Sequence, residues 1–143
     1  MRILTVVFVL VGLSSCKTAT NALTTSAALP ELSSAASSAI AGDMVSRLSE
    51  QIGPATGIIV LKQDASLFGQ ALFVALKKGG YAIVTDQEID SKVPRIQLAY
   101  VVDSFEGQTL ARLSTRKIEL TRAYSTNAAG ASPVSPLSIM QRS

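Results

Sequence analysis

The chain of 143 residues has no histidine and no tryptophan, and it contains a single cysteine. Histidine is the commonest general base at neutral pH and the commonest ligand for transition metals, so both chemistries lack their usual side chain. A single cysteine cannot form a disulfide within the chain. A serine or threonine nucleophile would need a lysine base, but the serines are concentrated in low-complexity stretches that give them no rigid support. We therefore expect no enzyme activity, no cofactor and no small-molecule substrate.

Charged side chains are also few, and neither sign dominates. Lysines and arginines number 13 against 10 aspartates and glutamates, which gives a formal net charge of +3. An excess this small does not indicate nucleic-acid binding, and no aromatic residues alternate with the basic ones as a base-stacking surface requires. Asp86, Glu88 and Asp90 cluster in one polar stretch, but they lack the glycine and the later glutamate of a calcium loop. We expect neither direct nucleic-acid binding nor a metal site.

The first residues have the pattern of an exported lipoprotein. Arg2 precedes an uncharged, almost wholly apolar run over residues 3–13, which is shorter than the roughly 20 residues that cross a bilayer. A leucine and two serines then lead to the cysteine, which resembles the lipobox at which bacterial lipoproteins are cleaved and acylated. The alternative is an ordinary secretory signal with a free thiol, but this cysteine lies at the one position that a lipobox requires. The predicted lipobox is Leu13, Ser14 and Ser15, and the predicted lipidation site is Cys16.

This pattern divides the chain into segments. We predict a lipoprotein signal peptide over residues 1–15, a lipidated cysteine with a flexible tether over 16–30, a folded domain over 31–125 and a Pro/Ser-rich tail over 126–143. Lys17 bears on location, because an aspartate directly after the lipidated cysteine resembles the signal for retention in the inner membrane. The lysine leaves delivery to the outer membrane as the default, so we predict that the palmitate-bearing protein is anchored there with its domain facing the periplasm.

Hydrophobic periodicity predicts helices and strands in the first half of the domain. Apolar residues recur at every fourth position over residues 32–52, which indicates an amphipathic helix ended by Gly53-Pro54. A strand at residues 57–61, a helix over 67–78 and a strand at 81–84 follow. A connection of this length that carries a helix usually joins parallel strands of one sheet. We therefore expect a β-α-β unit.

The second half of the domain is predicted to be antiparallel. Residues 95–103 alternate between polar and apolar, a turn follows at 104–107, and a second alternating stretch covers 109–124 as one bent strand or two. Leu110 and Leu113 break strict alternation, which suggests a bulge. The last residues would either extend a sheet edge or stay loose. The predicted fold class is α+β: a small two-layer sandwich with two helices on one face of a four- to five-stranded mixed sheet, containing the β-α-β unit and a C-terminal hairpin.

The returning strand and its continuation are distinctly basic. On alternate positions some of these residues share one face, where they are candidates for contact with a negatively charged partner or with lipid phosphates. The alternative is that they keep an exposed sheet face soluble and protect an edge against mispairing. The sequence leaves both interpretations open. The candidate partner-binding residues are Arg112, Arg116, Lys117 and Arg122.

Three stretches are similar to the TrbH family of conjugal-transfer lipoproteins. The first runs from Phe-Gly-Gln-Ala-Leu at residues 68–72 to Lys-Gly-Gly-Tyr-Ala at 78–82, and the second is Leu-Ala-Tyr-Val-Val-Asp at 98–103. The third joins Arg-Ala-Tyr at 122–124 to Pro-Val-Ser-Pro-Leu-Ser at 133–138. A helix followed by Gly-Tyr and a strand also occurs in lipopolysaccharide-assembly lipoproteins of the LptE type. The second stretch and the tail favour TrbH.

The resemblance implies a subunit of the mating-pair formation apparatus, the type IV secretion machine that carries plasmid DNA between bacteria. It implies partners among the other subunits of that complex and a membrane contact through the N-terminal lipid. No catalytic site is credited to the family. The alternative function is a lipid- or lipopolysaccharide-binding envelope-assembly lipoprotein of the LptE type, in which the basic strand would contact acidic headgroups.

Overall fold

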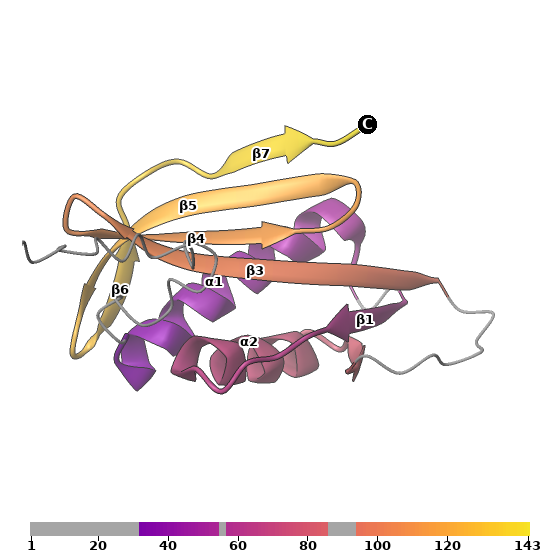
Figure 1. The fold of residues 1–143 in the computed structure, drawn as a ribbon, viewed down its shortest axis with the longest axis horizontal. Coiled ribbons are helices and arrows are strands. Elements are labelled where there is room, and N and C mark those ends of the chain that lie inside the picture. The colour runs from indigo at the N-terminus through magenta and orange to yellow at the C-terminus, as the bar shows by residue number, and fades with distance from the viewer. Residues whose placement is uncertain (1–31, 55–56, 86–93) are drawn as a thin grey trace, which may run out of the picture.

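A computed structural model describes residues 32–54, 57–85 and 94–143, which form two helices packed against a seven-stranded sheet (Figure 1). The strand order is β2-β1-β3-β4-β5-β6, and β7 also pairs with β5. The predicted signal peptide, the lipobox and the acidic cluster at residues 86–90 lie outside the described residues. The elements are α1 (Ser34–Ile52), β1 (Ile58–Leu61), α2 (Leu67–Lys78), β2 (Ala82–Val84), β3 (Arg95–Phe105), β4 (Gln108–Ser114), β5 (Ile118–Asn127), β6 (Gly130–Pro133) and β7 (Ser138–Gln141).

Helix α1 forms where the periodic apolar residues lie. Ser33 caps it, because its hydroxyl accepts a hydrogen bond of 3.0 Å from the backbone N–H of Ala36, one of the donors that a helix start leaves free. The helix ends at Gly53, whose φ of 86° is a conformation that glycine adopts without steric cost. The predicted stripe is confirmed, since its central members are fully buried. These are Ala36, Ile40, Met44 and Leu48.

The predicted β-α-β unit is confirmed. Strand β1 lies between β2 and β3 and is parallel to both. The intervening helix α2 is capped by Ser66, whose hydroxyl accepts a hydrogen bond of 2.9 Å from the backbone N–H of Gly69. Lys77 and Lys78 occupy the last turn of α2, where positive charge complements the helix dipole.

Strands β3, β4 and β5 form the antiparallel half of the sheet. The alternating stretch after residue 108 is two strands, joined by a turn in which Thr115 Oγ1 accepts a hydrogen bond of 3.1 Å from the backbone N–H of Ile118. The predicted bulge is wrong, because pairing with β5 is continuous over residues 109–114. Leu110 and Leu113 are three positions apart in a regular strand, so they lie on opposite faces of the sheet.

The C-terminal residues extend the sheet. Strand β6 pairs with β5 at its Asn127 end, and β7 pairs with β5 at its Ile118 end, so both short strands lie along one edge of β5. Pro133 ends β6, an edge strand, which is a position where proline is tolerated. These strands raise the total to seven, against the four or five that we predicted. The α+β two-layer class is otherwise confirmed.

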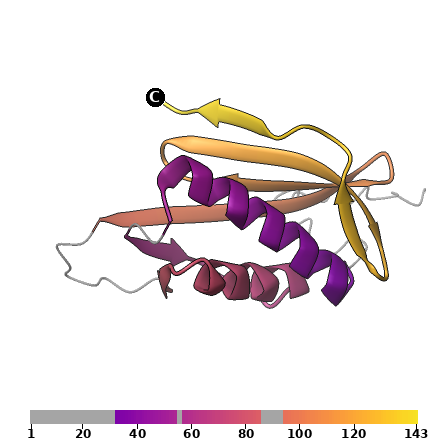
Figure 2. The same ribbon diagram turned by 180° about the vertical axis from the view of Figure 1, so that it is seen from behind.

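Both helices cover the same face of the sheet, as the opposite views in Figures 1 and 2 show. The inward side chains of the long strands, such as Leu98, Leu113 and Leu120, are buried with α1 and α2 in one hydrophobic core. No element of the described part of the chain lies over the other face, which we call the open face. The alternation of the strands places on it the odd-numbered residues of β3 and β5 and the even-numbered residues of β4.

Candidate functional site

The structure separates the four basic residues that the sequence analysis grouped together. Arg112 lies on the open face with half of its side chain exposed, and Arg116 and Lys117 are exposed in the β4–β5 turn. Arg122 instead points toward the helices, and only 17% of its side chain is exposed. It follows Ile118 and Leu120 at two-residue steps, so the strand alternation that buries them also turns Arg122 inward.

Asp43 of α1 holds two side chains of β5 with one carboxylate oxygen. Arg122 Nη1 donates to Asp43 Oδ2 at 2.9 Å, and the hydroxyl of Tyr124 donates to the same atom at 2.6 Å. Arg122 Nε also donates to the backbone carbonyl of Ser135 at 3.1 Å. Burial, and then the neighbouring Asp43 carboxylate, raises the pKa of Tyr124 far above its ordinary range. The cluster therefore fixes α1 and the residue 135 loop to β5 with a phenol that stays protonated.

A second ion cluster lies on the open face. Glu119 has only 10% of its side chain exposed, because Arg112 and Arg142 flank it. Arg112 Nε lies 3.4 Å from one carboxylate oxygen and Arg142 Nη2 lies 2.7 Å from the other. The backbone N–H of Arg142 also donates to the carbonyl of Lys117 at 2.7 Å. These contacts fasten the C-terminal strand to β5.

Arg142 is a residue that the sequence analysis did not single out. It stands 23 positions from Glu119, and no local pattern links two residues at that separation. Arg142 adds a further cation at the end of the sheet where the β4–β5 turn lies. We call this group the basic end of the open face, and it consists of Arg112, Arg116, Lys117 and Arg142.

A third polar cluster lies where α2 meets β3. Tyr100 Oη accepts a hydrogen bond of 2.9 Å from the backbone N–H of Asp64, whose carboxylate accepts one of 3.1 Å from the backbone N–H of Ser66. Burial raises the pKa of Tyr100 to about 12. Burial also raises the pKa of Asp64, but hydrogen bonds from Ser66 and Tyr100 outweigh it and hold that pKa below its usual value. These bonds set the start of α2 against the sheet.

Gly69 fits this cluster because it has no side chain. A Cβ at this position would lie 2.6 Å from Tyr100 Oη and would also overlap the Asp64 carboxylate. Real Cβ atoms essentially never approach other atoms so closely. The glycine in the first of the three family-like stretches therefore has a physical reason, which is the close approach of α2 to β3.

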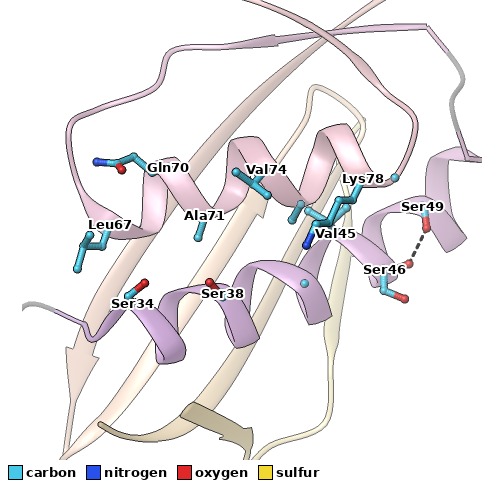
Figure 3. A pocket seen from close by; sticks show the side chains of 13 residues that line it. Ser34, Ser38, Val45, Ser46, Ser49, Leu67, Gln70, Ala71, Val74 and Lys78 are labelled. Carbon is cyan, nitrogen blue, oxygen red and sulfur yellow. Dashed lines mark hydrogen bonds between the residues drawn. The ribbon is translucent and has the colours of Figure 1, made fainter. Parts of the chain in front are cut away.

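A groove of about 580 Å³ runs between α1 and α2 (Figure 3). Helix α1 lines it with small residues that include Ser38 and Gly42, and α2 lines it with Ala71 and the half-exposed Val74. Among the described residues that line the groove, Lys78 alone is charged. The described lining residues therefore include no pair of titratable groups that could transfer a proton between them.

The described ranges also contain no arrangement typical of a metal centre, since no group of three or more Cys, Asp or Glu side chains comes together there. Neither described helix has the length and hydropathy of a membrane span. Leu13, Ser14, Ser15 and Cys16 lie outside the described ranges, so the lipidation site stays a prediction.

These features define a two-layer α+β domain with an open sheet face and a basic end. Residues 18–143 match the model of the family described as "Conjugal transfer protein TrbH". The "Probable conjugal transfer protein TrbH" of Sinorhizobium fredii is 52% identical over 147 residues, an alignment that covers 99% of each chain. No solved structure matches the chain. The chain belongs to the TrbH family of conjugal transfer proteins, which confirms the resemblance and supports a role in conjugal transfer.

Proposed function

We propose that this protein is a lipid-anchored subunit of the outer membrane that helps to assemble a type IV secretion apparatus for conjugal transfer. The observation that carries the proposal is the position of the single cysteine. Cys16 directly follows the predicted lipobox in a chain that belongs to a conjugal transfer family. The mature protein would begin at that residue, carry its acyl chains there, and face the periplasm.

The proposed mechanism is positional. One acyl chain gives only marginal membrane binding and stable anchoring takes more than one, as in a processed lipoprotein. Residues 17–31 span at most about 50 Å at roughly 3.4 Å per residue, so the domain would stay within that distance of the membrane. Confinement of this kind raises the effective concentration of the domain near other membrane-bound subunits. The protein would act by binding and holding partners, not by catalysis.

The side chains of the described region support a binding role. The three polar clusters each join secondary-structure elements, and the helix groove has one charged residue. Surface available for a partner lies instead on the open face, at its basic end and along the outer edge of β7. Edge strands bind extended segments by backbone pairing, which suits an assembly subunit.

The test is the substitution Cys16→Ala, compared with the unaltered gene in cells that lack the chromosomal or plasmid copy. We expect the variant to incorporate no labelled palmitate, to leave the outer-membrane fraction and to lower the frequency of plasmid transfer. A matched control joins the unaltered Cys16 and the residues after it to the signal peptide of a different lipoprotein. This control should restore labelling, location and transfer together. Normal transfer by a demonstrably unlipidated protein would exclude anchoring as the basis of function.

A second candidate function is binding of lipid or lipopolysaccharide, as in lipoproteins of the LptE type. The observation that favours it is the basic end of the open face, where Arg116 and Lys117 form no ion pair within the described residues. Binding of labelled lipopolysaccharide that is lost in Arg116→Glu/Lys117→Glu would support this function. Co-purification with subunits of a secretion channel, unchanged in the same variant, would support assembly.

A further inference from the structure

The open face gathers exposed apolar side chains of the sheet. Val101 and Phe105 of β3 are 51% and 59% exposed on it, and Val134 is 47% exposed at its far edge. Leu110 and Ala123 lie between them, because Leu110 pairs with Ala123 and the Ala123 carbonyl accepts a hydrogen bond of 2.9 Å from the backbone N–H of Val134. We call these residues the apolar band. Asp103 lies between Val101 and Phe105 on β3, so the band surrounds one carboxylate, and exposed apolar side chains gathered in this way mark a contact site.

Charge on the open face is separated along the strands. The basic end lies at the β4–β5 turn, on the side where β3 begins with Arg95. At the opposite end Asp103 lies beside Leu110, and Glu106 stands in the β3–β4 turn. No basic side chain occurs on the open face at this acidic end among the described residues. The face is therefore positive at one end and negative at the other, with the apolar band reaching from its middle to the acidic end.

We propose that two copies of this chain associate through their open faces, with the strands of one copy running opposite to those of the other. A two-fold axis between the sheets, perpendicular to the strands and crossing β3 near Val101, brings the central part of the apolar band, around Val101, onto that of the second copy. It also brings the basic end of each copy toward Asp103 and Glu106 of the other. A two-fold interface must be complementary to itself, and the separation of charge gives the open face this property. Two stacked sheets interdigitate their side chains in this way in β-sandwiches.

The size of the face suits a pair of copies. Strands β3 and β5 have 11 and 10 residues, and β4 lies between them with 7. At about 3.3 Å per residue and about 4.8 Å between strands, these three strands and the short strands β6 and β7 beside them have a flat footprint of about 570 Å². The relief of the side chains brings the accessible area close to the roughly 800 Å² per partner of a stable interface.

A lipid bilayer is the alternative partner for the apolar band of the open face. An anionic bilayer attracts the basic end, but it repels Asp103 and Glu106, which have no cationic partner within the described part of the chain. A second copy supplies cations for both carboxylates. The charge pattern therefore favours a protein face of opposite polarity over a membrane.

The test uses the full chain in its own cell envelope and introduces one cysteine at a time. Ala99→Cys, Val101→Cys, Leu110→Cys and Thr121→Cys place a thiol on the open face near the centre of the interface. Mild oxidation should link two copies of at least one of these variants, seen as a dimer without reductant. Val74→Cys is the matched control, because Val74 is equally exposed at 49% but lies on α2. It should give no dimer.

Charge reversal tests the proposed orientation. Glu106→Lys and Lys117→Glu should each lower co-purification of two differently tagged copies by at least about tenfold, since each sets like charges of the two copies against one another and neither residue forms an ion pair within the described part of its own chain. The double variant should recover most of the association. Open-face cysteines that dimerise no better than Val74→Cys, or that link to a different protein, would overturn the proposal, as would a double variant no better than either single one. Dimers of the unaltered protein would come from Cys16 and would count against its lipidation, not against this interface.

Discussion

Strand β5 takes part in an arginine–carboxylate contact on each face of the sheet, and the two contacts differ in their surroundings. On the helix side, Arg122 and Asp43 have 17% and 23% of their side chains exposed. On the open face, Glu119 is 10% exposed while its two arginine partners are 50% and 49% exposed. Loss of a partner inside leaves a charge with little water to replace it, whereas an exposed guanidinium keeps its hydration. The inner contact therefore holds the fold, and the outer arginines remain available to a partner.

The most direct test of this difference between the two faces is to remove the inner carboxylate, Asp43. Asp43→Ala leaves the Arg122 guanidinium and the Tyr124 hydroxyl without their shared acceptor. We expect the free energy of unfolding to fall by about 3 kcal/mol, measured by urea denaturation of the purified protein. Glu50→Ala is the control, because Glu50 is 52% exposed and its ion-pair partner Arg47 is 40% exposed. The control should change the free energy by less than about 0.5 kcal/mol, and equal losses in both variants would contradict the distinction.

On the helix side of the sheet, an added methyl group is expected to destabilise the fold at one glycine and to stabilise it at another. Gly69→Ala sets a Cβ against the Asp64 carboxylate and Tyr100 Oη, so we expect a loss of about 2 kcal/mol. Gly42→Ala has no atom within 4 Å of the new Cβ, and alanine in a helix is favoured over glycine by about 1 kcal/mol. Thermal unfolding of both variants should move in opposite directions. Stabilisation by Gly69→Ala would mean that α2 does not approach β3 so closely.

Alkaline pH should lower the free energy of unfolding through Tyr100, whose side chain lies on the helix side of the sheet. Its pKa is about 12 in the fold against an ordinary value of 10.0, so the folded state holds the proton more tightly. The stabilisation from this shift is complete below pH 10 and is lost as the pH rises from about 10 toward about 12. Tyr100→Phe should therefore show a shallower decline of the free energy of unfolding over this range, measured by urea titration at each pH. Parallel declines in both proteins would contradict the assignment.

The smallest expected effect is on the open face. Arg142→Ala removes one of the two partners of Glu119 but leaves Arg112 in place. We expect a loss of less than about 1 kcal/mol, because an exposed ion pair contributes little. Hydrogen exchange should localise the change to β7 and the adjoining part of β5. A loss as large as that of Asp43→Ala would show that the two faces do not differ as described.

The elements that the sequence predicted share a clear period. The four-residue spacing in α1 and the two-residue spacing in β3 and β5 each leave one apolar face, which the core then buries. Strands β6 and β7 have four residues each and no such spacing, so nothing local distinguishes them from a loose tail. Their pairing with β5 depends on a neighbour that only the folded sheet supplies.

The polar contacts between distant residues also have no local signal in the sequence. Asp43 and Arg122 stand 79 positions apart, and the sequence contains no signal that joins them. The inward direction of Arg122 was nevertheless available, because it continues the alternation of Ile118 and Leu120. Grouping it with Arg112 by charge alone ignored that alternation. The two-residue period predicted the face of the sheet toward which the Arg122 side chain points. Its charge indicated only that the side chain needs an ion-pair or hydrogen-bond partner.

The start of α1 and the C-terminal strand β7 reach opposite ends of β5. The hydroxyl of Ser33, just before α1, donates to the carbonyl of Asn127 at 3.1 Å, whereas Gln141 pairs with Ile118. Tension applied between the start of α1 and the C-terminus therefore runs parallel to the long strands. At the C-terminal end it would have to shear the hydrogen bonds between β7 and β5 together instead of opening them one by one. A protein held at one end and gripped at the other would resist mechanical load along this axis.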